Sequence, residues 1–364
     1  MKILMTADAV GGVWTYALEL ARALRAFDTE VCIATMGPRP DLDQVAAAAA
    51  LDNVTLFSGD YRLEWMEDPW RDVEAAGEWL LELEQQCTPD IVQINGYAHA
   101  ALPFSAPIVL VAHSCVYSWW RAVHGPLPPS QWDEYGRRVT TGLNAADVVV
   151  APSNAMARAL RACYDLRRAA TVIPNGRAAS PFAPAEKRNV IMAAGRVWDE
   201  AKNLRTLMDA APRLSWPVRI AGPDTAPDGT RIAAPSVDML GRLSGHDLAD
   251  ALGNTAVFVH PALYEPFGLG VVEAALCGCA LVLSDIASLR ENWDRAALFV
   301  PPRDTDALVA AIEYLIAFDD ERNTLARRAR DRALLFAPER MARAYMDLYK
   351  RLATRRTTRL ACAS

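Results

Sequence analysis

The sequence has few lysines and none of the residue spacings typical of a metal site. Only four of its 38 basic residues are lysines. Its seven cysteines form no CxxC pair, and its five histidines form neither an HExxH motif nor an i,i+4 pair. Zinc sites and disulfide frameworks need such spacings, so we expect no metal ion and reduced, buried thiols. The residues concerned are Cys32, Cys87, Cys115, Cys163, Cys277, Cys279, Cys362, His99, His113, His124, His246 and His260.

Two Asp-x-Asp triplets remain as candidates for binding a cation. Asp41–Asp43 and Asp304–Asp306 each come where a helix is expected to begin. Acidic residues at a helix start stabilise its positive end and accept hydrogen bonds from its unpaired N–H groups. We therefore interpret both triplets as helix N-caps.

The sequence also lacks long hydrophobic runs and an excess of basic over acidic residues. The apolar, charge-free stretch at about Ala274–Ser284 falls short of the roughly 18 apolar residues of a membrane span. Lys2 is followed by a short apolar run and then Asp8, so no secretory signal is visible. The 38 basic and 44 acidic residues give a net charge of −6, which disfavours nucleic acid as a partner. We expect a soluble, cytoplasmic protein.

The composition is that of an ordinary globular protein, with 52% apolar and 23% charged residues over 364 positions. This length predicts two domains, each large enough for its own core. Strand-like apolar runs alternate with amphipathic helices up to a linker near Pro174–Pro184. Strands are expected at Lys2–Ala7, Val31–Thr35, Val54–Phe57, Ile91–Ile94, Ile108–Ala112, Val148–Ala151 and Thr171–Ile173, and helices at Gly11–Phe27, Trp70–Cys87, Trp132–Asn144 and Asn154–Cys163.

A second series of strands and helices follows the linker. Continuous apolar strands separated by helices are typical of parallel sheets covered on both faces. We therefore predict an α/β protein with two doubly wound, Rossmann-like domains, residues 1–175 and 176–338, and a last helix near 339–354 that packs back on the first. Ligands of such sheets bind outside the carboxyl ends of the strands, so the domains are expected to face each other across a cleft. The second series comprises strands Val190–Ala194, Val218–Ala221, Val237–Leu240, Val257–His260, Ala280–Leu283 and Ala297–Val300, and helices Asn203–Leu214, His246–Leu252, Leu269–Cys277, Asp306–Phe318 and Glu321–Leu335.

The two halves differ in charge. Residues 1–175 carry 13 basic and 21 acidic side chains, against 25 and 23 in residues 176–364. The second half is therefore the better place for an anionic ligand.

The most informative segment of the second half runs from Leu263 to Ala280. Glu265 lies in a loop after a strand, Phe267–Gly270 opens a helix, and Glu273 lies about one turn inside it. Unpaired N–H groups at a helix start bind anions, and two carboxylates around them suit a ligand with both phosphates and hydroxyls. The alternative is that Glu265 stabilises the helix dipole and Glu273 is a solvated helix residue.

Two cationic side chains and a glycine pair could help to bind the same ligand. Arg196 ends a strand and Lys202 opens the next helix, so together they could clamp a diphosphate; alternatively, Lys202 is a surface residue. Gly11-Gly12 opens the first helix without completing a G-x-G-x-x-G fingerprint. The pair either lets a ligand approach the backbone or serves only a tight turn.

His113 and a group of aromatic residues are the candidates in the first half. His113 ends a strand and is expected to face the cleft, with a structural histidine as the alternative. Aromatic faces suit the C–H side of sugars, so one group is a candidate acceptor wall; core packing or a membrane-surface anchor are the alternatives. This group comprises the aromatic residues Tyr117, Trp119, Trp120, Trp132 and Tyr135, together with Arg121.

Together these segments resemble the retaining, nucleotide-sugar-dependent glycosyltransferases of family 4, which have the GT-B fold of two Rossmann-like domains. The Glu265…Glu273 spacing matches the family's E-x7-E element and is the most specific feature, whereas the glycine pair is the least specific. The other matching segments are Ala112-His113, Val150–Ser153, Val172–Gly176, Gly195-Arg196 and Lys202-Asn203.

The resemblance implies a role for each matching residue. Arg196 and Lys202 would bind the donor diphosphate, His113 would lie beside the transferred sugar, and Glu265 would hold that sugar. Gly222-Pro223-Asp224 departs from the family pattern, which often has a second glycine before the proline. The implied catalytic residues are His113, Arg196, Lys202 and Glu265. The implied donor-binding residues are Gly12 at the phosphate, Arg196, Lys202, Gly241, Arg242 and Leu243 at the base, Phe267, Gly268, Leu269 and Gly270 at the phosphates, and Glu273 at the ribose hydroxyls.

The resemblance also implies the reaction. A hexose would pass, with retention of configuration, from a nucleoside-diphosphate sugar to a saccharide or lipid-linked acceptor in surface polysaccharide or glycolipid assembly. No cofactor is expected, and the cations with the helix N-terminus would take the place of a divalent metal. A lipid-linked acceptor would imply peripheral contact with the inner membrane face. A nucleotide-sugar epimerase and a non-catalytic sugar-nucleotide-binding protein are the alternatives.

Overall fold

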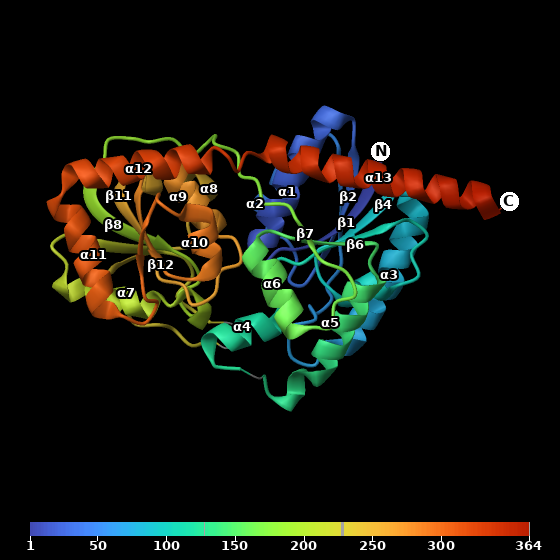
Figure 1. Cartoon of the computed structure of the whole chain (residues 1–364), viewed down its shortest axis with the longest axis horizontal. Coiled ribbons are helices and arrows are strands. Elements are labelled where there is room, and N and C mark those ends of the chain that lie inside the picture. Colours follow the sequence, from blue (N-terminus) through green and yellow to red (C-terminus); the bar gives the residue numbers. More distant parts are fainter. Residues whose placement is uncertain (127, 227–228, 364) are drawn as a thin grey trace. The chain divides into compact units, whose positions relative to one another are not determined.

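The computed structural model describes residues 1–126, 128–226 and 229–363, with side chains up to residue 354 (Figure 1). The chain divides into two units. Unit 1 comprises Met1–Trp120, Leu127–Gly176 and Pro338–Ser364, and unit 2 comprises Arg121–Pro126 and Arg177–Ala337. Each unit is built on one parallel sheet, and each is described by itself below.

Unit 1 contains a seven-stranded sheet in the order β3-β2-β1-β4-β5-β6-β7. In β1, Lys2 pairs with Glu30 and Asp8 with Met36 of β2, and the other side of β1 pairs with β4. The strand order therefore reverses between β1 and β4. Each strand coincides within one residue with a predicted apolar run: β1 (Lys2–Asp8), β2 (Glu30–Met36), β3 (Val54–Ser58), β4 (Ile91–Ile94), β5 (Ile108–Val111), β6 (Val148–Ala151) and β7 (Thr171–Val172).

Helices cover both faces of this sheet. Alternate side chains of a strand point to opposite faces, so Ile3 and Met5 pack under α1 and α13, whereas Leu4 packs under α3 and α5. α4 begins in unit 1 and its last residues belong to unit 2. The helices are α1 (Gly12–Leu24), α2 (Leu42–Ala49), α3 (Trp70–Cys87), α4 (Val116–Val123), α5 (Asp133–Ala145), α6 (Asn154–Cys163) and α13 (Pro338–Ala363).

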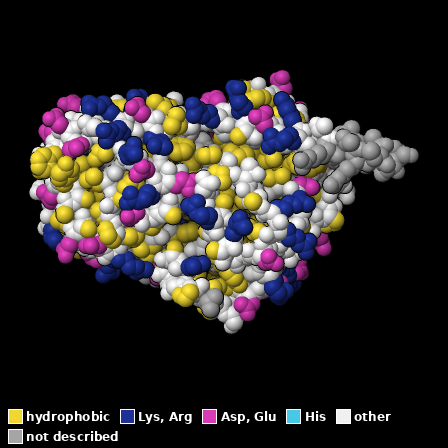
Figure 2. All heavy atoms as spheres, in the orientation of Figure 1, with side chains coloured by type: hydrophobic (Ala, Val, Ile, Leu, Met, Phe, Trp, Pro, Cys, Tyr) yellow, Lys and Arg dark blue, Asp and Glu magenta, His cyan; other side chains and the backbone are white. Residues whose placement is uncertain are grey.

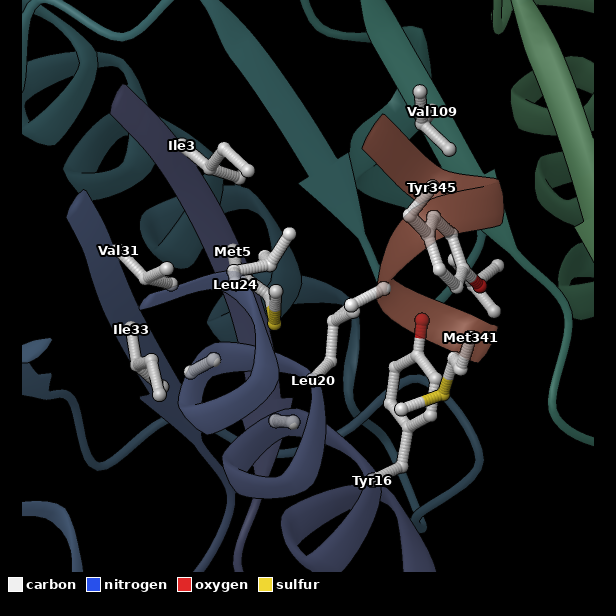
Figure 3. Packing of buried hydrophobic residues seen from close by; sticks show 14 of the residues in the cluster. Ile3, Met5, Tyr16, Leu20, Leu24, Val31, Ile33, Val109, Met341 and Tyr345 are labelled. Carbon is white, nitrogen blue, oxygen red and sulfur yellow. The ribbon is translucent and has the colours of Figure 1, made fainter. Parts of the chain in front are cut away.

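The last helix, α13, returns to unit 1 after the whole of unit 2 and packs against α1 (Figure 1). Its Met341, Tyr345 and Tyr349 are buried. Figure 3 shows Met341 and Tyr345 beside Tyr16 of α1, with the hydroxyl of Tyr16 directed toward α13. The hydrophobic face of α13 therefore completes the core on one side of the first sheet.

Unit 2 contains a six-stranded sheet in the order β10-β9-β8-β11-β12-β13, which reverses between β8 and β11. α8, α9 and α12 pack on one face, and α7 and α11 pack on the other. The elements are β8 (Arg188–Ala194), α7 (Leu204–Ala210), β9 (Val218–Ala221), β10 (Asp238–Gly241), α8 (Gly245–Gly253), β11 (Thr255–His260), α9 (Leu269–Leu276), β12 (Ala280–Ser284), α10 (Ala287–Trp293), β13 (Leu298–Val300), α11 (Thr305–Ala317) and α12 (Asp319–Ala333).

The segment Arg121–Pro126 groups with unit 2, although the expected first domain included it. Arg303 Nη2 donates to the carbonyl oxygen of Val123 at 2.8 Å, and His124 Nε2 lies 3.4 Å from Glu200 Oε2. Contacts between residues far apart in sequence therefore assign this segment, and the local pattern of the chain could not show them.

Both Asp-x-Asp triplets begin helices, as predicted. Asp41 accepts a hydrogen bond from Gln44 N at 2.9 Å in a capping box at the start of α2. Asp304 accepts one from Ala307 N at 2.9 Å at the start of α11. Among the described residues, no group of three or more His, Cys, Asp or Glu side chains could hold a metal ion.

The cysteines whose side chains are described form no disulfide, and five of the six are buried, Cys163 being half-buried. The side chain of Cys362 lies outside the described residues. Arginine side chains lie on the outer face of α12, where Arg327, Arg328 and Arg330 are exposed (Figure 2). Within the part of the chain that is described, no helix combines the length and apolar character needed to cross a bilayer.

Candidate functional site

Two loops of unit 2 lie where its strand order reverses. β9 follows β8 on one side of the sheet, and β12 follows β11 on the other. In doubly wound sheets such a reversal creates a crevice at the carboxyl ends of the strands, where ligands bind. The loop after β8 carries Arg196 and Lys202, and the loop after β11 carries Glu265.

Lys202, His260 and Glu265 form one cluster at this place. Lys202 Nζ donates to Glu265 Oε2 at 2.7 Å, and His260 Nε2 lies 3.2 Å from the same oxygen. The side chains of Lys202, His260 and Glu265 are 21%, 5% and 13% exposed. Because a carboxylate oxygen only accepts, His260 presents the N–H at Nε2. The predicted alternative, a surface lysine at position 202, is wrong.

Glu265 remains ionised although it is buried. Burial alone would raise the pKa of the Glu265 carboxyl, but the charge of Lys202 and the hydrogen bond from His260 hold it well below its ordinary range. The carboxylate is charged at neutral pH and keeps the ammonium group of Lys202 in place. His260 was not among the predicted site residues, and its position at the end of a strand was the only signal in the sequence.

Backbone hydrogen bonds join the two loops. Leu263 N donates to the carbonyl oxygen of Ala201 at 2.8 Å, so the residue before Lys202 is tied to the segment before Glu265. The short distance between Lys202 and Glu265 is thus supported by the main chain as well as by their charges.

The helix α10, which was not predicted from the sequence, binds the Glu265 loop through two side-chain hydrogen bonds. The hydroxyl of Ser288 donates to the carbonyl oxygen of Glu265. Asn292 Nδ2 donates to the carbonyl oxygen of Phe267 at 3.3 Å. Both side chains are buried, so they fix the direction in which this loop enters α9.

The N-terminus of α9 follows directly. Gly268 is its N-cap with φ 92°, a left-handed conformation that favours glycine, and it supplies no side-chain cap. The first N–H groups of a helix have no acceptor within it and carry the positive end of its dipole. A Cβ built on Gly270 would meet no atom within 4 Å, so open space lies beside this end.

Arg196 contributes a second cation to the loop after β8. Its Nη2 donates to Asp199 Oδ2 at 2.5 Å, and its guanidinium lies 5.5 Å from the ring centroid of Trp198. Its Nε is buried and has no hydrogen-bond partner among the described residues. A buried N–H without an acceptor is costly, and an oxygen of an anionic ligand would satisfy it.

Glu273, one turn into α9, is buried and paired with a residue that sequence reasoning missed. Arg177 Nε donates to Glu273 Oε1 at 2.7 Å, and the guanidinium of Arg177 lies 4.7 Å from the ring centroid of Phe182. The alternative of a solvated helix residue at position 273 is therefore wrong. The one signal for Arg177 was its place directly after the matching segment Val172–Gly176.

Glycines bring the loops after β8, β9 and β10 together. Gly222 has φ 138°, and a Cβ there would lie 1.9 Å from the carbonyl oxygen of Gly195, so only glycine allows this approach. Gly222 N donates to the carbonyl oxygen of Gly241 at 2.7 Å. Arg242, which is exposed, and Leu243, which packs against the core, follow at this edge; their contact with a base stays a prediction.

In unit 1, Gly12 and His113 lie at the carboxyl edge of the sheet. Gly12 is exposed at the start of α1, directly after the strand next to the reversal. His113 follows β5, with its Nε2 3.1 Å from Asn95 Oδ1 and its ring edge-on to Tyr16 at 4.5 Å between centroids. Burial lowers the pKa of His113 to about 3, so the imidazole is neutral at pH 7.

The residues proposed as an acceptor wall separate into two groups. Tyr117, Trp132 and Tyr135 pack with the core, Tyr135 is only 2% exposed, and Tyr117 donates to the carbonyl oxygen of Trp132 at 3.2 Å. Tyr135 is therefore a core residue, which was the alternative interpretation. The remaining three lie on α4 and are half-buried or exposed: Trp119, Trp120 and Arg121.

Two family sequence profiles match the chain. Residues 10–179 match Glycosyltransferase Family 4, and residues 188–317 match Glycosyl transferases group 1. The alpha-maltose-1-phosphate synthase of Mycolicibacterium smegmatis is 28% identical over 297 residues, which cover 70% of this chain and 75% of that protein.

Solved structures share the fold. Sucrose-phosphate synthase from Thermosynechococcus elongatus has a TM-score of 0.79 and 20% identity over 97% of this chain and 99% of that chain. Anabaena HepE in complex with UDP-glucose has a TM-score of 0.77 and 17% identity over 97% of this chain and 100% of that chain.

Proposed function

Since the chain belongs to glycosyltransferase family 4 and has the GT-B fold, we propose that this glycosyltransferase moves a hexose with retention of configuration. The donor is a nucleoside-diphosphate sugar, the acceptor is a saccharide or a lipid-linked saccharide, and no cofactor or metal ion takes part. The product belongs to surface polysaccharide or glycolipid assembly. A lipid-linked acceptor would bring the protein to the inner face of the membrane.

One observation carries this proposal: Lys202, His260 and Glu265 are clustered directly before the uncapped N-terminus of α9. The cluster combines N–H donors for phosphate oxygens with a carboxylate that is charged at neutral pH. Because Lys202 and Arg196 are each paired with a carboxylate, the site carries little net charge before a ligand enters. The diphosphate is then bound by their remaining N–H groups and by the N-terminus of α9.

The charged groups of the site match the charges that develop when the donor bond breaks. When the bond between the anomeric carbon and the phosphate oxygen breaks, its electron pair leaves with the diphosphate and the sugar ring becomes positive. Lys202, Arg196 and the α9 N-terminus are preorganised to stabilise the first charge, and the Glu265 carboxylate stabilises the second. The acceptor hydroxyl attacks from the leaving-group face, and its proton passes to the departing phosphate, so Glu265 need not act as a nucleophile.

The test is acceptor-dependent release of nucleoside diphosphate. Thermal-shift screening of a panel of nucleotide sugars first identifies the donor, which is then incubated with and without saccharide acceptors, in the presence and absence of EDTA. We expect release only with acceptor, no effect of EDTA, and an unchanged anomeric configuration in the product by NMR. Turnover of donor without acceptor would instead indicate an epimerase, and donor binding without turnover would indicate a binding protein.

A further inference from the structure

A buried hydrogen-bond network in unit 1 connects α13 to His113. The hydroxyl of Tyr349 on α13 donates to Gln93 Oε1. Gln93 Nε2 in turn donates to the hydroxyl oxygen of Tyr16 at 3.1 Å and to Asn95 Oδ1 at 3.4 Å. Asn95 Oδ1 also lies 3.1 Å from Nε2 of His113. Asn95 is therefore the group through which the network contacts the histidine.

The orientation of the Asn95 amide is fixed by the backbone beside it. Asn95 Nδ2 donates to the carbonyl oxygen of Thr6 at 2.6 Å, and Asn95 N donates to Thr6 Oγ1 at 2.8 Å. A carbonyl oxygen can only accept, so the amide nitrogen must face Thr6 and the amide oxygen must face His113. The hydrogen bond from Gln93 Nε2 to Asn95 Oδ1 is compatible with this assignment.

This orientation determines which tautomer His113 adopts. Because Asn95 Oδ1 accepts, His113 must carry its proton on Nε2, and in the neutral ring Nδ1 is then an acceptor. The titratable groups around the network are Tyr16 of α1 and Tyr345 and Tyr349 of α13, and burial raises the pKa of all three phenols. These neutral hydroxyls add no charge, so the burial of His113 keeps its ring neutral.

We propose that Asn95 is a positioning residue: it holds His113 as the neutral, Nε2-protonated tautomer, so that Nδ1 accepts a hydrogen bond from a substrate hydroxyl. The substrate side of this inference rests on the proposed function, since a sugar supplies such a hydroxyl. The tautomer itself rests only on the contacts within unit 1. Neither the family resemblance nor the sequence pattern singled out Asn95.

The first experiment reads the tautomer directly, without activity. The full chain is labelled with ¹⁵N-histidine, and the His113 signals are assigned by their loss in His113→Gln. In the wild type we expect a protonated Nε2, an unprotonated Nδ1 and no titration between pH 5 and 8. In Asn95→Ala the Nδ1-protonated form should appear. In Asn95→Asp, where a carboxylate replaces the amide, His113 should titrate within this range.

A matched control separates these effects from a general loss of packing. Asn53 in the same unit also directs Nδ2 at two backbone carbonyls, those of Ala21 and Thr29, each at 2.9 Å. Asn53→Asp should therefore lower the melting temperature as Asn95→Asp does, while the His113 signals stay as in the wild type. A protonated Nδ1 in the wild type, or unchanged His113 signals in Asn95→Ala, would overturn the proposal.

The second experiment measures the consequence for turnover. We expect Asn95→Ala to lower kcat/KM by about 10–100-fold, the range typical of removing a side chain that orients a metal-binding histidine. Asn95→Asp should lose activity toward acid pH, where the wild type does not. Asn53→Asp should show the wild-type pH profile. If the wild type transfers no sugar, the proposed function fails while the ¹⁵N spectra still decide the role of Asn95; wild-type kinetics in Asn95→Ala would overturn the proposal.

Discussion

Replacing Lys202 with methionine tests both the electrostatics and the chemistry of the site in unit 2. Lys202 Nζ and Glu265 Oε2 are 2.7 Å apart. With an effective dielectric constant of about 20, two unit charges at this distance attract by roughly 6 kcal/mol. Desolvation offsets part of this attraction in the intact pair. Removing one partner leaves the other charge buried, which typically costs about 3–5 kcal/mol. We expect Lys202→Met to destabilise the protein by that amount.

A double variant separates the stability effect from catalysis. In Lys202→Met with Glu265→Gln no charge remains buried, and His260 Nε2 can still donate to the amide oxygen of the glutamine. The double variant should recover most of the lost stability, because the destabilising group is the unpaired carboxylate. It should not recover activity, because the cation that we propose for the diphosphate and the carboxylate that we propose for the sugar are both missing.

Urea denaturation and steady-state kinetics provide the measurements. At saturating donor, Lys202→Met should lower kcat by about 10²–10³-fold, more than it weakens donor binding, because the charge of Lys202 matters most when the diphosphate leaves. Equal kcat for variant and wild type at saturating donor would refute the catalytic argument. A stability loss below about 1 kcal/mol would show that the pair behaves like an exposed surface pair.

Three further predictions concern other residues. Arg177→Gln should raise the Kd of a nucleoside diphosphate about tenfold in calorimetry, because Glu273 loses the partner that orients it. Gly222→Ala should lower the free energy of unfolding by at least about 2 kcal/mol in denaturation, since its Cβ would collide with the carbonyl oxygen of Gly195. Burial raises the pKa of Glu64 from 4.5 to about 7, so folding favours its protonated form and stability falls as pH rises between these values. Glu64→Gln should abolish this loss of stability. The melting temperature of the variant minus that of the wild type should therefore increase from pH 5 to pH 8.

Each of these predictions has a control or a contrary outcome. Gly245→Ala places its Cβ in open space and should change stability by less than about 1 kcal/mol. Glu67→Gln, on an exposed residue in the same loop as Glu64, should follow the wild-type pH dependence. Unchanged nucleotide affinity in Arg177→Gln would mean that Glu273 keeps its orientation without the arginine.

The fold could be predicted largely from the sequence because buried parallel strands leave a strong pattern. Each strand is a short apolar run bounded by polar residues, and Asp41 and Asp304 mark two helix starts by their chemistry. The missed helices α4 and α10 span only eight and seven residues. A helix of about two turns leaves little periodicity in the sequence.

The site was predicted less completely because its geometry depends on pairs that are distant in sequence. Glu265 and Lys202 belong to recognisable loops, but their contact with each other and with His260 follows only from the neighbouring positions of β8 and β11. Arg177 reaches Glu273 across 96 positions. Tyr135 shows the opposite error, since it was a candidate for the acceptor wall but is buried in the core.

The position of α13 has a consequence for the order in which this protein matures. During synthesis the ribosome releases all of unit 2 before it releases Tyr345 and Tyr349, so the sheet face that α1 and α13 share is covered by α1 without α13 throughout that time. Gln93 Oε1 receives the hydrogen bond from the Tyr349 hydroxyl only when the last helix docks. The side chains around His113 therefore reach their final arrangement only at the end of assembly, and a chain that terminates before α13 lacks the Tyr349 hydroxyl that donates to Gln93.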